Sequence, residues 1–513
     1  MKIAWFTPLS KRTGVSKYNL SAVNALSKKV DLDVWTIKDR DNLNIERVNV
    51  YEIVLSDENI RKLKDYDVVI YNMGNNIDFH YEIYEFYKRV KGIVILHDKV
   101  MHHFFVGHFL DRLRMPAEYI NIMQHYYGTK GREIANRSLA KFPPVWETED
   151  VAKYPLFEHL LWNTYGIVVH SRDLFDKVTR ISPVPAKHIF HPFYQYPEDN
   201  ICLSREDLKI PHNKTILLQY GHITPNKNVH KVIEAISEYP EIRDHIHFIV
   251  AGDCNTPYGK NIKNLIKEKG LHDTISLTGH VSDSVLQAYI KCSDICINLR
   301  FPSTEGASGS LIEQLYFKKP VIATRIGFFA EIPDECVLKL EPPINTKDLS
   351  EAIKLLVNNK EFRDKLGAKG SEFAYKNFSP DLYAKNFVGF LKDVLSFKTS
   401  VDLIDSVSDE ISNFVTPTTS EYFIDNISRE ISTISGGQDS ENERINRAPY
   451  SLSEELCEDF QPARKWGYDS NELSVSLKDK FISLGWRHRN TIKKIPLLNS
   501  ISRKLYHSYL YND

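Results

Sequence analysis

The sequence of 513 residues predicts an α/β protein with two domains, each built on a parallel sheet, and a C-terminal extension. Three observations lead to this prediction. Short apolar runs alternate with amphipathic segments over the first 400 residues, a pattern typical of parallel strands that helices cover on both faces. A stretch with several prolines near residue 190 interrupts the alternation. After residue 400 the composition changes sharply, which marks the end of the second domain.

Length and charge limit the class of protein. Hydrophobic residues make up 42% of the sequence and aromatic residues 12%, enough for buried cores. The 66 basic and 67 acidic residues give a net charge of −1, so the chain lacks the basic excess of a protein that coats nucleic acid. No run of 18 apolar residues is present, and we expect no transmembrane helix.

The cysteines and the first residues favour a reducing compartment. None of the six cysteines has zinc-site or CxxC spacing, so we expect free thiols in the core. The opening apolar run is short and Pro8 interrupts it, unlike the run of a signal peptide. We therefore expect a cytoplasmic protein, with peripheral binding to the inner face of the cell membrane left open.

Residues 1–195 predict the N-terminal domain. Its buried strands are expected at 2–7, 32–37, 68–71, 93–96 and 166–169, where the chain is largely apolar. A helix is expected over 16–26, because its apolar residues lie near helical spacing. Asp31 and Asp33 could form a metal-binding DxD pair, but they open an apolar run. We interpret them as the start of a strand.

A linker is expected over 190–213, and the second domain is predicted over residues 196–377. Its strands are expected at 215–220, 246–251, 274–277, 294–299 and 320–323. Helices are expected over 229–236 and 310–317, and a terminal helix over 378–395.

Two segments of opposite charge follow. Residues 401–477 are predicted to be an acidic linker, partly helical and partly disordered, because 401–459 carry 14 acidic and 3 basic residues. Residues 478–513 form a basic amphipathic tail with 8 basic and 2 acidic residues. Its basic and aromatic residues favour an anionic membrane surface. A helix docked on the body of the protein is the alternative.

The clearest sign of a binding site is the segment from Glu305 to Glu313. It follows an expected strand and precedes an amphipathic helix, and small residues fill its centre. Such a loop presents backbone N–H groups and a helix N-terminus to a ligand, which suits phosphate. The two carboxylates would repel a bare diphosphate. They suit the vicinal hydroxyls of a sugar and a ribose, because a carboxylate accepts several hydrogen bonds.

Two further strand ends carry polar side chains. Lys227 lies in a loop after an expected strand and is a candidate phosphate ligand, together with His222. The alternative is a solvated loop lysine. His97 directly follows another strand, and the carboxyl ends of parallel strands are where α/β proteins bind ligands. His102 and His103 are nearby, but their spacing matches no convincing metal site.

Together these motifs resemble the retaining glycosyltransferases of the GT-B fold, family four. Glu305 and Glu313 match the E-x7-E motif of that family, and Gly221 to Lys227 resembles its phosphate loop, G-R-x4-K. The segment around Gly14 looks like its N-terminal glycine loop, and residues 94–105 look like the strand with its active-site histidine. The resemblance covers about residues 1–397. It implies two Rossmann-like domains that face a central cleft, with the helix of segment 378–397 crossing back to the N-terminal domain.

The resemblance also implies roles for residues. The catalytic residues would be His97, Glu305 and Lys227. The donor, a nucleotide-diphosphate sugar, would be bound by Gly14, His222, Lys227, Glu305, Gly306, Ala307, Ser308, Gly309 and Glu313. Transfer would retain the anomeric configuration, with no metal and no cofactor, because cations and helix dipoles would offset the charge of the leaving diphosphate.

Two departures from the family pattern affect the substrate. His222 replaces the usual arginine, so a titratable group stands where the family has a fixed cation. Small residues replace the usual apolar residues within E-x7-E, as in a subgroup that builds bacterial surface polysaccharides. The acceptor implied is a growing surface glycan, such as a polysaccharide, lipopolysaccharide or glycoprotein glycan, or its lipid-linked form. A GT-B-type epimerase or phosphorylase and a non-catalytic glycan-binding scaffold remain alternatives.

Overall fold

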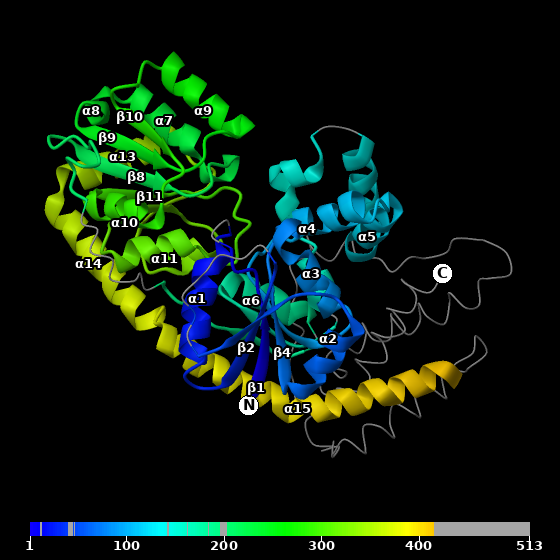
Figure 1. The fold of residues 1–513 in the computed structure, drawn as a ribbon. Coiled ribbons are helices and arrows are strands. Elements are labelled where there is room, and N and C mark those ends of the chain that lie inside the picture. Colours follow the sequence, from blue (N-terminus) through cyan, green and yellow to red (C-terminus); the bar gives the residue numbers. More distant parts are fainter. Residues whose placement is uncertain are drawn as a thin grey trace, which may run out of the picture.

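The computed structural model describes residues 1–414, apart from 11–12, 39–44, 46, 141–142, 162, 183 and 195–202. The side chains of 397, 399–401 and 403–414 are not described. Most of the predicted acidic linker, from residue 415, and the whole basic tail over 478–513 lie outside the described residues. Figure 1 shows two domains, each with a sheet covered by helices, and a long C-terminal helix that runs along the N-terminal domain.

The N-terminal domain contains a seven-stranded parallel sheet with the order β3-β2-β1-β4-β5-β6-β7. The strands are β1 (Lys2–Phe6), β2 (Asp31–Thr36), β3 (Asn49–Glu52), β4 (Val68–Met73), β5 (Gly92–Leu96), β6 (Thr164–Val169) and β7 (Ala186–His188). Helices α1 (Val15–Leu26), α2 (Asp57–Lys62), α3 (Ile77–Tyr87) and α6 (Arg172–Ile181) connect them. The central strands are buried on both faces, which explains their continuous apolar sequences.

A helical insertion separates β5 from β6. It contains α4 (His102–Val106), the π-helical turn η2 (Gly107–Arg112), α5 (Pro116–Ala140) and the 3-10 turns η3 (Val145–Glu147), η4 (Glu149–Lys153) and η5 (Phe157–Leu161). Gly128 has a φ of 64° and kinks α5, a conformation that glycine adopts without steric cost. Figure 1 shows α4 and α5 in a lobe beyond the sheet of this domain.

The second domain contains a six-stranded parallel sheet with the order β10-β9-β8-β11-β12-β13. The strands are β8 (Thr215–Tyr220), β9 (Ile246–Ala251), β10 (Ile275–Gly279), β11 (Ile295–Asn298), β12 (Val321–Thr324) and β13 (Leu338–Leu340). The helices are η6 (Pro225–Lys227), α7 (Val229–Glu238), α8 (Pro240–Arg243), α9 (Pro257–Glu268), α10 (Asp283–Cys292), α11 (Gly309–Tyr316), α12 (Gly327–Glu331), α13 (Thr346–Asn358) and α14 (Lys360–Asn377).

The predicted fold class is confirmed: both sheets are wholly parallel and helices cover them. Every strand expected from an apolar run is present, and Asp31 and Asp33 do belong to a strand. The sequence analysis missed β3, β7 and β13. All three are edge strands with polar or charged residues. An edge strand is covered less completely than a central one, so it need not be apolar.

The predicted terminal helix is present as α15 (Pro380–Phe414), but it is longer than expected. It continues through the first 14 residues assigned to the acidic linker. The helix packs against α1 and β6 of the N-terminal domain, so the chain does return to the first sheet after completing the second. Figure 1 shows α15 running along this domain.

Replacing Phe387 with alanine is expected to lower the free energy of unfolding of the N-terminal domain by about 3–5 kcal/mol. Phe387 is fully buried, and its ring centroid lies 5.4 Å from that of Trp5 in β1. The change would leave a cavity between α15 and the sheet. Urea unfolding followed by tryptophan fluorescence would measure the loss. Lys385→Ala on the exposed face of the same helix is the control, and equal midpoints for both variants would contradict the packing role.

Candidate functional site

Two loops from different domains meet at the carboxyl ends of their sheets. The loop after β5 runs beside the loop after β11. Lys99 donates its backbone N–H to the carbonyl of Thr304 at 2.9 Å, and Gly306 donates its N–H to the carbonyl of His97 at 2.9 Å. This backbone pairing brings His97 from the first domain next to the E-x7-E segment of the second.

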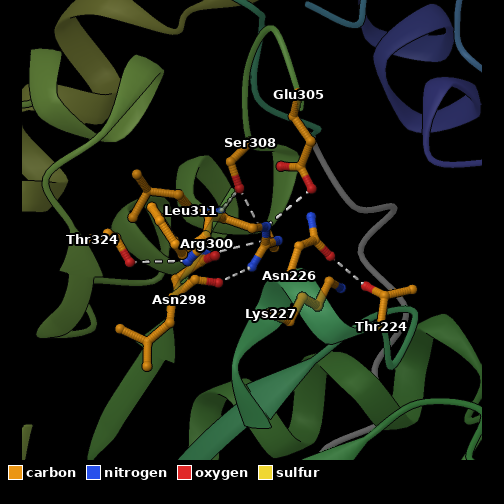
Figure 2. Close-up of polar contacts among 12 residues, drawn as sticks. Thr224, Asn226, Lys227, Asn298, Arg300, Glu305, Ser308, Leu311 and Thr324 are labelled. Carbon is orange, nitrogen blue, oxygen red and sulfur yellow. Dashed lines mark hydrogen bonds and ion pairs between the residues drawn. The ribbon is translucent and has the colours of Figure 1, made fainter. Parts of the chain in front are cut away.

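Glu305 is held by a cation that the sequence analysis did not assign to the site. The Nε of Arg300 donates to Oε1 of Glu305 at 3.0 Å. Arg300 follows β11, and its own backbone N–H donates to Oγ1 of Thr324 at the end of β12, also at 3.0 Å. Figure 2 shows the guanidinium between Glu305 and the loop that carries Asn226 and Lys227. An arginine directly after a buried strand was the available sequence signal for this role.

Lys227 is buried beside this pair. Its Nζ donates to the carbonyl of Tyr220 at 3.3 Å, and a Cβ on Gly221 would lie only 2.6 Å from that Nζ. Burial lowers the pKa of Lys227 to about 7, with a further contribution from the charge of Arg300, while Glu305 acts in the opposite direction. Near neutral pH the lysine is therefore partly uncharged, and an anion bound beside it would favour the protonated form.

The N-terminus of α11 lies on the same loop. Ser308 caps the helix by accepting a hydrogen bond from the N–H of Leu311. Glu313 follows about one turn later, and the hydroxyl of Tyr220 donates to its Oε2 at 2.6 Å. Burial raises the pKa of Glu313, whereas Lys17 of the N-terminal domain, 3.5 Å away, opposes the shift. The predicted placement of one carboxylate in the loop and one in the helix is confirmed.

Lys17 links the two domains. It lies in α1, just after Gly14, and forms ion pairs with Asp283 at 3.1 Å and with Glu313 at 3.5 Å. Gly14 is the N-cap of α1, so it lies within one helical turn of these ion pairs. The sequence analysis missed Lys17 because its partners come from the other domain.

His97 has a fixed tautomer. Asn72 donates its Nδ2 to the carbonyl of Phe6 at 3.0 Å, so its Oδ1 faces the ring and accepts from Nε2 of His97 at 2.9 Å. The ring also packs against Tyr18 and His170, with centroids 4.6 and 5.3 Å away. Burial first, and the neighbouring histidines next, lower its pKa well below the usual range. The imidazole is therefore neutral, with its proton on Nε2 and a lone pair on Nδ1.

Asp98, directly after His97, is a further carboxyl group in this region. Its Oδ2 accepts a hydrogen bond from the N–H of Asn75 at 2.7 Å, and its backbone forms a β-bridge with Glu305. Burial raises the pKa of Asp98 to about 7, and the charge of Glu305 adds to the shift.

The remaining predicted residues lie at the margins of this group. His222 is exposed, and its imidazole makes no hydrogen bond to a described residue. Partial desolvation of its ring by the surrounding loops first, and then the charge of Lys227, lowers its pKa. It stands near a depression of about 480 Å³ that the loops after β9 and β10 border, including Asp253 and His280. Ala307, which lies between Glu305 and Glu313 in the sequence, is half-buried.

Two other kinds of feature are absent from the described residues. No three histidine, cysteine, aspartate or glutamate side chains there are grouped so that they could hold a metal ion. No helix in that part of the chain is long and apolar enough to cross a membrane.

Gly306 is expected to be essential for the pairing of the two loops. A Cβ at this position would lie 2.6 Å from the carbonyl oxygen of His97, closer than atoms tolerate, so Gly306→Ala must separate the loops. An overpacking cost of about 1–3 kcal/mol corresponds to a fall of about 5- to 160-fold in kcat/KM for a reaction at these loops. Gly389→Ala is the control, because Gly389 lies in α15 away from these loops and a Cβ there meets no atom within 4 Å. Equal rates for both variants would show that the pairing is dispensable.

The two domains define a class of protein. The structure resembles that of HepE of Anabaena, solved in complex with UDP and glucose, with a TM-score of 0.54 over 77% of this chain and 100% of that chain. The sequence identity is 14%, so the likeness concerns the fold. The protein has the GT-B fold, as predicted.

A match to a glycosyltransferase family covers most of the second domain. Residues 202–373 match the family described as glycosyl transferases group 1. The chain is 22% identical to the alpha-D-kanosaminyltransferase of Streptomyces kanamyceticus over 256 residues, 48% of this chain and 65% of that protein. It is also 22% identical to the O-antigen biosynthesis glycosyltransferase WclY of Escherichia coli over 361 residues, 66% of this chain and 85% of that protein. The chain therefore carries a group 1 glycosyltransferase domain.

In three of the curated relatives that it matches, the chain spans between 42% and 65% of their length. The fold is thus established, together with the group 1 match over residues 202–373, and the family and activity of the whole chain are proposals.

Proposed function

We propose that the protein is a retaining glycosyltransferase that moves a sugar from a nucleotide-diphosphate sugar to a growing bacterial surface glycan. The observation that carries the proposal is the group formed by Glu305, Arg300 and Lys227 at the N-terminus of α11. The loop carrying His97 is paired to it from the opposite domain. Cations, a helix N-terminus and carboxylates then line one place between two domains, which fits a ligand that has both a diphosphate and hydroxyl groups.

Each part of the donor has a suitable partner. Lys227 and the N–H groups at the start of α11, from Gly306 to Gly309, would stabilise the charge that grows on the diphosphate as it leaves. Glu305 would accept hydrogen bonds from the sugar. Glu313, already an acceptor for the hydroxyl of Tyr220, would accept from the ribose. We propose that these groups suffice without a metal or a cofactor.

His97 would act as a neutral hydrogen-bond acceptor. Its Nε2 proton is committed to Asn72, so the Nδ1 lone pair is the part of the ring that can receive a hydroxyl of the sugar or of the acceptor. No carboxylate is assigned as a nucleophile. The leaving phosphate would take the proton of the acceptor on the attacked face, and the sugar would keep its anomeric configuration.

The proposal is tested in two steps. A panel of sugar nucleotides is first screened by thermal unfolding, since a ligand at 100 times its Kd stabilises a protein by about 2.7 kcal/mol. The best donor is then incubated with and without candidate acceptors, and the product is followed by NMR. We expect transfer that depends on an acceptor, with the anomeric configuration retained. Conversion of the donor in the absence of an acceptor would instead identify an epimerase, and binding without either reaction would identify a scaffold.

We also propose that the enzyme works in the cytoplasm, at the inner face of the cell membrane, on a glycan or lipid-linked acceptor. The similarity to an O-antigen glycosyltransferase supports the acceptor class. The tail over 478–513, with 8 basic and 2 acidic residues, supports the location, because each basic residue near an anionic surface contributes about 1 kcal/mol.

Truncation after residue 477 is expected to lower binding to vesicles that contain anionic lipid, while transfer to a soluble acceptor is unchanged. Flotation of vesicles with and without anionic lipid measures the binding. Raised salt should weaken it for the full chain, since the attraction is electrostatic. The same flotation for both chains would reject the tail as the membrane anchor.

A further inference from the structure

Arg300 occupies an unusual place for a charged side chain. Its side chain is only 4% exposed. It donates from Nε to Glu305 at 3.0 Å and from Nη1 to the carbonyl of Leu299 at 2.8 Å, and its Cζ lies 5.7 Å from the ring centroid of Phe329. A guanidinium has five N–H donors, and the Nη2 group of Arg300 donates to no described residue. The side chain is thus held rigidly while part of its fork is left without an acceptor.

The backbone fixes this side chain against the phosphate loop. The N–H of Phe301 donates to the carbonyl of Asn226 at 2.7 Å, which ties the segment after β11 to the turn that contains Lys227. Figure 2 shows the guanidinium beside Asn226, on the same side as the carboxylate of Glu305. Arg300 is also close enough to Lys227 for its charge to lower the pKa of that lysine.

The charges in this group do not balance when Lys227 is protonated. Arg300 and Lys227 then face one carboxylate, Glu305, in a setting where water is largely excluded. A buried cation without a counter-charge is costly, so an anionic ligand would be stabilised here.

His222 stands where the phosphate loop of the resembled family has an arginine, and it cannot supply this positive charge. His222 is exposed, and its pKa is lowered, so at neutral pH it carries little charge. A guanidinium keeps its charge under these conditions and can bind two phosphate oxygens at once.

We infer that Arg300 is a diphosphate-binding residue of the cleft, supplying from the end of β11 the fixed cation that position 222 lacks. The inference rests on the proposed function for the identity of the anion as a nucleoside diphosphate. The alternative is that Arg300 only positions Glu305 and never contacts the ligand.

The experiment compares ligands with and without phosphate in the full chain. The affinities of UDP, GDP and inorganic pyrophosphate are measured by calorimetry at pH 6, below the pKa of about 7 of Lys227, so that the lysine is charged in every protein. Uridine and guanosine are measured by saturation-transfer NMR. We expect Arg300→Gln to lower the affinity for pyrophosphate, and for whichever of UDP and GDP the unmodified protein binds, by about 10- to 100-fold. The affinity for the nucleoside should not change.

Arg300→Lys is a second variant that keeps the test valid if Arg300→Gln does not fold. It keeps a positive charge but loses the fork, so the affinity for the diphosphate should fall less than in Arg300→Gln and still leave the nucleoside unaffected. Arg243→Gln is the control. Arg243 lies just before β9, at the N-terminal ends of the strands, and its substitution should change none of these affinities. Circular dichroism confirms folding of each variant.

The outcomes separate this inference from the proposed function. Unchanged affinity for UDP, GDP and pyrophosphate in Arg300→Gln, together with slower sugar transfer, would overturn the inference and leave the transferase intact. A loss of diphosphate affinity in a protein that transfers no sugar would support Arg300 as an anion ligand and reject the proposed function. Absence of any diphosphate or pyrophosphate binding by the unmodified chain would reject both.

Discussion

Lys227→Ala is expected to lower kcat/KM for sugar transfer by about 10- to 100-fold. The change removes a charge-assisted hydrogen bond to the departing diphosphate, a contribution of about 1.5–3 kcal/mol, and each 1.36 kcal/mol corresponds to a factor of ten. The effect should be large because Lys227 is 7% exposed, so that water cannot replace the lost charge efficiently.

The same lysine predicts how binding depends on pH. With a pKa of about 7 in the empty site, Lys227 loses its charge as the pH rises above 7. A bound diphosphate favours the charged form, so its affinity should fall above pH 7 and its binding should take up a proton. Calorimetry in buffers of different ionisation enthalpy would measure that uptake.

Lys267→Ala is the control for both measurements, because Lys267 is exposed near the end of α9, away from the cleft. A rate for Lys227→Ala like that of the unmodified protein would remove this residue from the site. Proton uptake that persists in Lys227→Ala would assign the titration to another group.

Glu305→Gln is expected to lower the rate of sugar transfer by at least about 100-fold while leaving the affinity for a nucleoside diphosphate unchanged or higher. A carboxylate that accepts two hydrogen bonds from sugar hydroxyls contributes about 3 kcal/mol or more. The same substitution removes the negative charge that balances Arg300 and Lys227, so a free diphosphate gains attraction.

Stopped assays of transfer and calorimetry with the free nucleotide would measure the two effects separately. Glu268→Gln, at the exposed end of α9, should alter neither. If Glu305→Gln weakened nucleotide binding as much as transfer, the carboxylate would not be the group that contacts the sugar.

The central strands could be predicted because they are covered on both faces. Strands such as β5 and β9 are buried over their whole length, and burial on both sides requires the continuous apolar runs that the sequence displays. The edge strands β3, β7 and β13 lack this signal, since they are covered less completely. The insertion between β5 and β6 was not predicted either. Its α4 and 3-10 turns are short, and in the longer α5 the break at Gly128 and the small number of buried residues weaken the helical periodicity.

Only those parts of the candidate site that lie in short local motifs could be predicted from the sequence. Glu305, Glu313 and Lys227 stood out because each lies in a loop or first turn directly after an apolar strand. The acceptor role of His97 did not, because it depends on Asn72, which is 25 residues away in the chain.

The sequence by itself determined two parallel-sheet domains and the strand ends at which we propose that ligands bind. These follow from periodicity and spacing, which are properties of neighbouring residues. Only the tertiary structure decided which charges meet. Arg300 reaches Glu305 and adjoins Lys227, and Lys17 reaches Glu313 from the other domain. The most distant of these contacts joins residues 296 positions apart, Lys17 and Glu313, and they exist only because the carboxyl ends of the two sheets face each other.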